Sequence, residues 1–299
     1  MSEPSEGRPG APSRPGRVPE KLGWVGLGAI GGPMARRLVD RPGGLVVCDV
    51  APGAVEPFAR RGVEAADNPS AVIAAGATIV SIVVRDDDQV RAVVEALVEA
   101  ASSDTVLAIH STIAPGTAEE LAEAGTRRGV HVVDAPVSGG PMGAASGRLA
   151  VLAGGPVAAV DRCRAALVGL ADLVVRFGEV GAGTRAKLAR NLITFASYAA
   201  VGEAHRLAAV NDLDLAALGE VVRHSDAVTG GPGAIMLGQG AGPLPADDGL
   251  RAVFAHTRAL GDKDLDLALA VAAHAGLDLP VAEAARRTLG AALGVDPGS

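Results

Sequence analysis

Three glycines behind a short apolar run constrain the fold more than any other feature of this sequence. Gly26, Gly28 and Gly31 follow the first apolar run, and Asp49 closes the next one. This order of strand, glycine turn, helix, strand and acid is typical of a dinucleotide-binding unit. Gly26 permits the tight turn, Gly28 lets backbone N–H groups approach a pyrophosphate, and Gly31 lets helix and strand pack closely. We therefore expect phosphates at a helix N-terminus, where unpaired N–H groups favour anions.

The carboxylate of Asp49 also indicates which nicotinamide cofactor the turn takes. A carboxylate at this place accepts hydrogen bonds from a ribose 2′-OH and repels a 2′-phosphate. The three residues after it are apolar, so no adjacent arginine is available to hold a phosphate. We therefore predict NAD over NADP. The alternative is that Arg60 or Arg61 folds back onto the site and accepts the phosphate.

Composition limits the classes of protein to which the chain can belong. A length of 299 residues predicts two domains. Hydrophobic residues make up 48% of the chain but aromatics only 2%, which suits helices packed closely on a parallel sheet. The net charge of −7 argues against nucleic acid or an anionic membrane as a partner. Cys48 and Cys163 are interpreted as buried apolar residues in a reducing cytoplasm, and the scattered histidines predict no metal site.

Short apolar runs alternate with helical stretches as far as residue 177. The predicted strands are Leu22–Val25, Leu45–Cys48, Thr78–Val83, Val106–Ile109, His131–Asp134, Leu149–Ala153 and Leu173–Arg176. The alternation predicts βαβ units, hence a Rossmann-type α/β domain with a mostly parallel sheet. Ligands of such sheets bind at the carboxyl ends of the strands, so the informative residues should follow strands. Asp86, Asp87 and Asp88 are assigned to the N-terminus of a helix and not to a metal.

The sequence changes character after Gly183. Residues 184–210 contain no proline and one glycine, which predicts a helix of 27 residues that spans about 40 Å. Residues 213–223, 250–275 and 281–293 are also expected to be helical, and 230–249 to be a loop. We therefore expect a disordered tail at residues 1–20, a Rossmann domain at 21–183 and an all-helical domain at 184–299, linked by the long helix. Neither a signal peptide nor a membrane span is expected.

Lys187 and Asn191 lie four residues apart on the predicted long helix, so their side chains project from one face. A lysine and an amide next to the nicotinamide ring can bind the substrate oxygen, move its proton and orient it. On spacing alone, a solvated first-turn lysine with an amide in the capping region is the favoured interpretation. The motifs around the pair decide between the two readings.

Five motifs in order resemble the β-hydroxyacid dehydrogenase family, which includes the 3-hydroxyisobutyrate dehydrogenases. The resemblance covers nearly all of residues 22–289. Its motifs are the glycine turn followed by Pro33-Met34-Ala35, Ser111-Thr112-Ile113-Ala114-Pro115, Asp134-Ala135-Pro136-Val137-Ser138-Gly139-Gly140, Gly181-Ala182-Gly183 with Lys187 and Asn191, and Lys263-Asp264-Leu265. The resemblance implies a hydride transfer between NAD and a small hydroxyacid or its semialdehyde. It also implies a homodimer or homotetramer.

The resemblance implies a role for each matching residue. Lys187 is expected to be the general acid/base, and Asn191 to contact the substrate hydroxyl or carboxylate. The substrate-binding residues are expected to be Ser138, Gly139, Gly140, Thr112 and Lys263. The cofactor-binding residues are expected to be Gly26, Gly28, Ala29, Ile30, Gly31, Asp49, Val83, Val84, Thr112 and Lys263. A hydroxyl and backbone N–H groups suit a carboxylate, because such charge-assisted hydrogen bonds fix its orientation.

Departures from the family pattern leave the substrate open. Relatives often carry an acid where this chain has Ile109, which is followed by His110, a residue expected near the cleft. Relatives often place a phenylalanine where His256 stands, which predicts a more polar pocket, unless Phe254 is the true counterpart. Glyoxylate or succinic semialdehyde reductase activity, imine reductase-like activity and a non-catalytic NAD-binding scaffold stay as alternatives. An intact Lys187 argues against the last two.

Overall fold

The computed structural model describes residues 19–210, 212–229, 243–274, 276 and 278–295. Most of the expected tail (1–20) and of the expected loop (230–249) lies outside the described residues. Glu20, at the end of the first segment, is described, and its Oε1 accepts a hydrogen bond from Nη2 of Arg162 at 2.5 Å. The described chain therefore begins with a segment that is tied to the sheet half by an ion pair.

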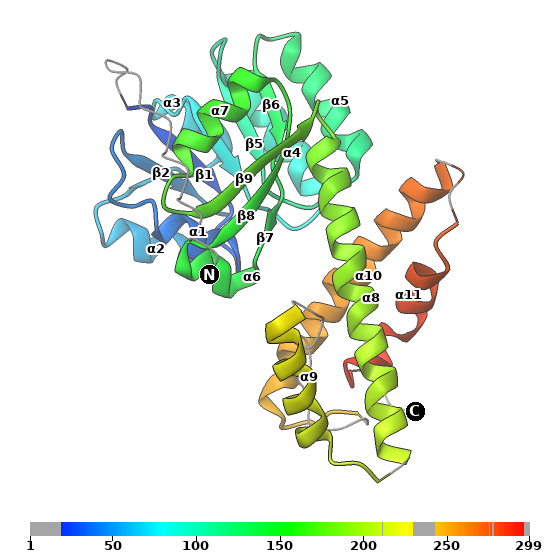
Figure 1. Ribbon diagram of the computed structural model, residues 1–299. Helices are drawn as coiled ribbons and strands as arrows, with labels where there is room; N and C mark the ends of the chain where they lie inside the picture. Colours follow the sequence, from blue (N-terminus) through cyan, green and yellow to red (C-terminus); the bar gives the residue numbers. More distant parts are fainter. Residues whose placement is uncertain (1–18, 211, 230–242, 275, 277, 296–299) are drawn as a thin grey trace, which may run out of the picture.

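Nine strands of the described residues form one sheet (Figure 1). They are β1 (Leu22–Val25), β2 (Leu45–Cys48), β3 (Glu64–Ala65), β4 (Ile79–Ile82), β5 (Val106–Ile109), β6 (His131–Asp134), β7 (Val137–Ser138), β8 (Leu149–Gly154) and β9 (Ala171–Gly178). The order is β3-β2-β1-β4-β5-β6-β8-β7, with β9 beside β8. All pairs from β3 to β6 are parallel, whereas β8 runs antiparallel to β6 and β7. The predicted α/β class with a mostly parallel sheet is confirmed.

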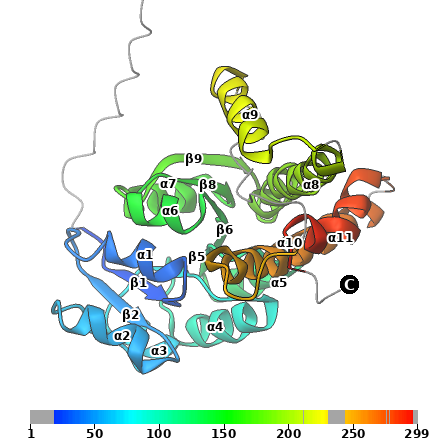
Figure 2. The same ribbon diagram turned by 90° about the horizontal axis from the view of Figure 1, so that it is seen from below.

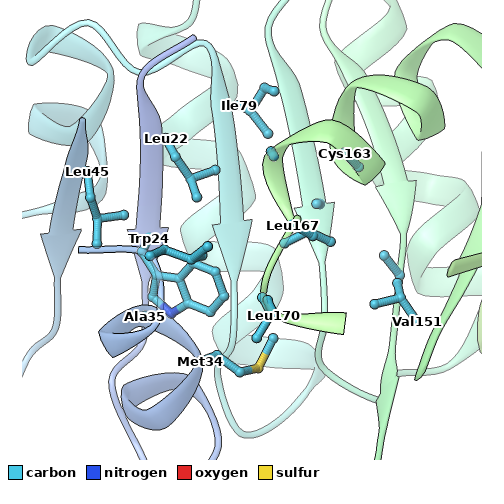
Figure 3. Close-up of a cluster of buried hydrophobic side chains, with 14 of the residues drawn as sticks. Leu22, Trp24, Met34, Ala35, Leu45, Ile79, Val151, Cys163, Leu167 and Leu170 are labelled. Atoms are coloured by element: carbon cyan, nitrogen blue, oxygen red, sulfur yellow. The ribbon is translucent and has the colours of Figure 1, made fainter. Parts of the chain in front are cut away.

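Helices cover both faces of this sheet. They are α1 (Gly31–Arg36), α2 (Pro52–Ala59), α3 (Pro69–Ala74), α4 (Asp87–Ala100), α5 (Pro115–Thr126), α6 (Gly140–Ser146) and α7 (Val157–Ala166). Strand residues alternate between the two faces: Leu22 and Trp24 pack with Met34 of α1 and Cys163 of α7 (Figure 3), and Val25 packs on the opposite face. Both faces are buried, which is why most residues of β1, β2, β4 and β5 are apolar.

The rest of the described chain is helical, as predicted. It contains α8 (Ala182–Val210), α9 (Leu215–Thr229), α10 (Gly249–His274) and α11 (Pro280–Ala292). The 29 residues of α8 span about 44 Å and run from the end of the sheet through the helical half (Figure 1). Phe195 of α8, Phe254 and Leu265 of α10 and Leu289 of α11 form the core of this half. The domain boundary at Gly183 stays a prediction; the structure places Gly183 in the first turn of α8.

The two halves meet where α10 passes the carboxyl end of β5. Nζ of Lys263 on α10 donates a hydrogen bond to the carbonyl oxygen of Thr112 at 2.8 Å. Figure 2, seen from below, shows α10 beside β5 and α5. The carboxyl edge of the sheet therefore faces the helical half, and the residues named by the sequence motifs gather there.

Candidate active site

The glycine turn joins β1 to α1 in a geometry that only glycine tolerates at two positions. Gly26 has φ +97°, and a Cβ there would lie 2.0 Å from the carbonyl oxygen of Val83. A Cβ on Gly31 would lie 2.2 Å from the carbonyl oxygen of Gly26. The turn is therefore packed tightly against the end of β4, as a close strand-to-helix connection requires.

The outer side of the same turn is open and fits a dinucleotide. Gly28 is exposed, and a Cβ on it would meet no atom within 4 Å. Oδ2 of Asp49, after β2, accepts a hydrogen bond from the N–H of Leu27 at 2.6 Å, and Oδ1 accepts one from the N–H of Ala51 at 2.8 Å. Each carboxylate oxygen keeps a further lone pair for a ribose hydroxyl. A pyrophosphate has room at Gly28, and an acceptor for the ribose lies next to it.

The two arginines that offered an alternative cofactor preference are paired elsewhere. Nη1 of Arg60 lies 3.2 Å from Oε1 of Glu56, and Nη2 of Arg61 lies 3.1 Å from Oδ2 of Asp40. Both pairs are exposed and weak individually. In the described residues neither guanidinium contacts Asp49. Neither arginine is therefore positioned to bind a 2′-phosphate next to it.

The loops after β4 and β5 are locked together beside the turn. The hydroxyl of Ser111 donates to the carbonyl oxygen of Val84 at 2.7 Å and accepts from the N–H of Val84 at 2.9 Å. This fixes the backbone of Val83 and Val84 next to Gly26. The residue after Ser111, Thr112, offers its carbonyl oxygen to Lys263.

His110 is buried between three strands and does not line an open cleft. Its Nδ1 lies 2.8 Å from the carbonyl oxygen of Ala135, its Nε2 lies 3.0 Å from Oγ of Ser81, and its ring stacks on Trp24 at 5.8 Å. Burial lowers the pKa of His110 to about 4. A neutral ring therefore donates from Nδ1 to Ala135 and accepts at Nε2 from Ser81. Trp24 in turn donates to the carbonyl of Gly26 at 3.1 Å.

Replacing His110 with glutamine is expected to remove an acid-sensitive part of the stability. The folded pKa of about 4 lies below the ordinary 6.5 of the unfolded chain, so the unfolded state binds the proton first as the pH falls. Stability from the neutral ring is complete above pH 6.5 and is lost progressively down to pH 4. From pH 7 to pH 5 the loss is about 2 kcal/mol.

Urea unfolding of wild type and His110→Gln at pH 7 and pH 5 measures this loss. The difference in unfolding free energy between the two proteins should shrink by that amount at pH 5. An unchanged difference contradicts a neutral buried ring. Asp134, whose pKa burial raises to about 6, titrates in the same window with the opposite sign, but it is present in both proteins and cancels.

Asp134 fixes the start of α8. Its Oδ1 accepts from the N–H of Gly181 at 2.8 Å, and its Oδ2 accepts from the N–H of Thr184 at 2.6 Å. A Cβ on Gly183 would lie 2.3 Å from the carbonyl oxygen of Leu152, so the first turn of α8 lies directly on β8. The residue one turn further along α8 is Lys187, whose position therefore depends on the ends of β6 and β8.

Lys187 is buried, and its ammonium is destabilised. Burial is the main cause that lowers its pKa to about 8, and the positive charges of Arg190 and Lys263 act in the same direction. The carboxylate of Asp264 opposes them. At neutral pH a lysine with this pKa exchanges its proton far more readily than one at the ordinary value near 10.4.

Asp264 joins the residues of the two halves. It accepts a hydrogen bond from Nδ2 of Asn191, and its Oδ1 lies 3.0 Å from Nζ of Lys263. The same Nζ reaches the carbonyl of Thr112. The structure thus brings Lys187, Asn191, Lys263 and Thr112 into one group, which the sequence motifs anticipated.

The other residues predicted to bind the substrate lie on β7, just after it and on α10. Ser138 is on β7 and pairs with Ala150 of β8, and Gly139 and Gly140 follow it with φ +129° and +60°. No hydrogen bond joins Ser138 to the lysines within the described residues. His256 is exposed two turns before Lys263 on α10, whereas Phe254 is buried in the helical core and is no counterpart in the site.

Three residues of the site had no role assigned from the sequence. They are Asp264, Asp134 and Arg190, whose Nη1 donates to Oδ1 of Asn191 at 3.1 Å. Asp264 was part of a motif that pointed to its neighbour Lys263, and Arg190 stands beside Asn191. For Asp264 and Asp134, the only signal in the sequence was that they lie in the motifs. For Arg190, it was that the neighbouring residue is Asn191.

Other expectations concerned metals and membranes. Asp86 caps α4 by accepting from the N–H of Gln89 at 2.9 Å, as predicted for the acidic run. In the described part of the chain, no group of three or more His, Cys, Asp or Glu residues has a metal-binding arrangement. Among the helices that the structure describes, none is long and apolar enough to cross a membrane.

Comparisons with known proteins agree with this geometry. Residues 21–178 match the model of the NAD binding domain of 6-phosphogluconate dehydrogenase, and residues 181–298 match that of the NAD-binding domain of NADP-dependent 3-hydroxyisobutyrate dehydrogenase. An uncharacterised oxidoreductase of Mycobacterium tuberculosis is 51% identical over 92% of this chain and 94% of its own. The 3-hydroxyisobutyrate dehydrogenase of Pseudomonas aeruginosa is 34% identical over 89% of each chain. The solved 3-hydroxyisobutyrate dehydrogenase of Mycobacterium tuberculosis with L-serine has a TM-score of 0.75 at 28% identity and covers 91% of this chain and 92% of its own.

Proposed function

Because the chain belongs to the β-hydroxyacid dehydrogenase family and is an NAD(P)-binding oxidoreductase, we propose that it transfers a hydride between NAD and a small β-hydroxyacid or its semialdehyde. The observation that carries the proposal is Lys187, a buried lysine whose pKa is lowered to about 8. It lies one helical turn from Asn191 and beside Lys263, which reaches across from the helical half. A scaffold that only binds NAD has no need of this arrangement.

The proposed mechanism assigns one task to each side chain. Ser138 and the N–H groups of Gly139 and Gly140 bind the substrate carboxylate. Neutral Lys187 takes the proton of the substrate hydroxyl during oxidation and, as an ammonium, returns it to the carbonyl oxygen during reduction. One N–H of the Asn191 amide is held by Asp264, which leaves the second to bind the substrate oxygen. NAD, when bound, would supply the hydride acceptor or donor, which is the cofactor's own chemistry.

The cofactor side supports NAD over NADP. Asp49 places a negative charge where a 2′-phosphate would lie, and Arg60 and Arg61 are paired with other acids. The cofactor contacts proposed are Gly26, Gly28, Ala29, Ile30, Gly31, Asp49, Val83, Val84, Thr112 and Lys263. Of these, Gly28 and Ala29 are exposed on the open side of the turn.

Assembly and location are further parts of the proposal. Apolar side chains on the helical half are exposed, among them Ile193 on α8 and Val221 and Val228 on α9. Such surfaces favour the proposed homodimer or homotetramer. Cys48 and Cys163 are buried free thiols, which suits the proposed cytoplasmic location.

A substrate panel tests the activity. We expect formation of reduced cofactor with one or more of 3-hydroxyisobutyrate, 3-hydroxypropionate, serine and glycerate, and faster with NAD than with NADP. Absorbance of the reduced nicotinamide measures it directly. Turnover of 4-hydroxybutyrate alone favours a succinic semialdehyde reductase instead. Cofactor binding without turnover on any of these acids favours the non-catalytic scaffold.

A further inference from the structure

Arg190 places a positive charge beside Lys187 and Asn191. It lies three residues after Lys187 on α8, and Asn191 lies four after, so the two side chains flank the direction in which Lys187 projects. The guanidinium is exposed, and its Nη1 donates to Oδ1 of Asn191 at 3.1 Å. The guanidinium therefore lies next to the amide that is proposed to bind the substrate oxygen.

The charges around this place do not balance. Lys263 has a carboxylate partner, since its Nζ lies 3.0 Å from Oδ1 of Asp264. Arg190 has none: in the part of the chain that the structure describes, the amide of Asn191 is the partner of its guanidinium. Other arginines of the same helix and its neighbour are paired, Arg185 with Glu119 at 2.6 Å and Arg258 with Asp262 at 3.3 Å.

The charge of Arg190 acts in both directions along α8. It is the second cause of the lowered pKa of Lys187. It opposes the burial that raises the pKa of Tyr198, two turns beyond Arg190 on the same face. The guanidinium thus lies between the proposed proton-transfer residue and a half-buried phenol, with five N–H donors in a planar fork that matches a carboxylate.

We propose that Arg190 binds a second carboxylate of the substrate, so that the preferred substrates are β-hydroxy dicarboxylates. This inference rests on the proposed function, because Ser138, Gly139 and Gly140 take the first carboxylate. The rise from Lys187 to Arg190 along α8 is about 4.5 Å, a separation that a short carbon chain spans. An arginine fork that binds a carboxylate forms two charge-assisted hydrogen bonds.

A matched pair of substrates tests the inference. Racemic 2-(hydroxymethyl)glutarate and racemic 2-(hydroxymethyl)pentanoate share the reacting carbons and the first carboxylate, and differ in a carboxylate against a methyl group at the far end. Wild type is expected to prefer the dicarboxylate by about 10- to 100-fold in kcat/KM. In Arg190→Gln that ratio should fall to near one, mainly through a higher KM for the dicarboxylate. Arg190→Lys keeps the charge without the fork and should give an intermediate ratio.

Arg185→Gln is the matched control, because it removes a guanidinium from the same helix that is already paired with Glu119. Its substrate ratio should equal that of wild type. Equal use of both substrates by wild type, or an equal loss for both in Arg190→Gln, overturns the role of Arg190 and leaves the dehydrogenase proposal standing. A wild type inactive on both substrates and on the whole panel of hydroxyacids overturns both proposals.

Discussion

Replacing Lys187 with alanine is expected to lower kcat by about 10²- to 10⁴-fold, which is the range that general acid–base catalysis contributes. The change removes the group proposed to exchange the substrate proton, and none of the hydrogen bonds described for the glycine turn and Asp49 involves Lys187. Affinity for NADH, measured by its fluorescence, should therefore stay within about threefold of wild type. Steady-state assays in both directions measure kcat.

The pH profile gives this prediction a second readout. With a pKa of about 8, Lys187 is mainly an ammonium at pH 7 and becomes a base as the pH rises. The rate of oxidation should therefore increase through pH 8 and level off above it, and the rate of reduction should fall over the same range. In Lys187→Ala, this change of both rates around pH 8 should be absent.

Lys21 is the control lysine for this experiment. It precedes β1 at the opposite edge of the sheet and pairs with Glu64 at 2.5 Å. Lys21→Ala should keep both the rate and the pH profile. If Lys187→Ala retains most of its activity, another group transfers the proton, and the role proposed for Lys187 is wrong.

The strands could be read from the sequence wherever both faces of the sheet are buried. β1, β2, β5 and β6 have the predicted bounds, because strands between two helix layers are mostly apolar. β3 and β7 were missed because two residues are too few to form a periodic pattern. Their existence depends on the neighbouring strands that they extend.

The site could be predicted only as far as the sequence motifs reach. Lys187 and Asn191 share one helix face, and the motifs around them gave the pair its predicted role. The contacts of Asp264 with Asn191, and of Asp134 with the start of α8, join segments far apart in the chain, so they depend on how the halves pack. His110 was expected near the cleft because it follows a strand, but its ring turns inward against Trp24 and is enclosed there.

Replacing Gly28 with valine is expected to weaken NADH binding by about 100-fold or more without destabilising the fold. A Cβ at this position meets no protein atom within 4 Å, so the side chain enters only the space proposed for the pyrophosphate. Loss of two or more charge-assisted hydrogen bonds between backbone and phosphate accounts for the size of the effect. Fluorescence titration of NADH measures binding, and thermal unfolding measures stability.

Variants of two further glycines are controls that distinguish a loss of cofactor binding from a loss of stability. Gly26→Ala should lower the melting temperature, because its Cβ would lie 2.0 Å from the carbonyl of Val83 and its φ is +97°. Gly249→Val, at the start of α10, also has open space around its Cβ and should change neither property. If Gly28→Val binds NADH as wild type does, the pyrophosphate does not lie on this side of the turn. If Gly28→Val loses both NADH binding and thermal stability, Gly28 is required for folding. The open space beside it then has no demonstrated role in cofactor binding.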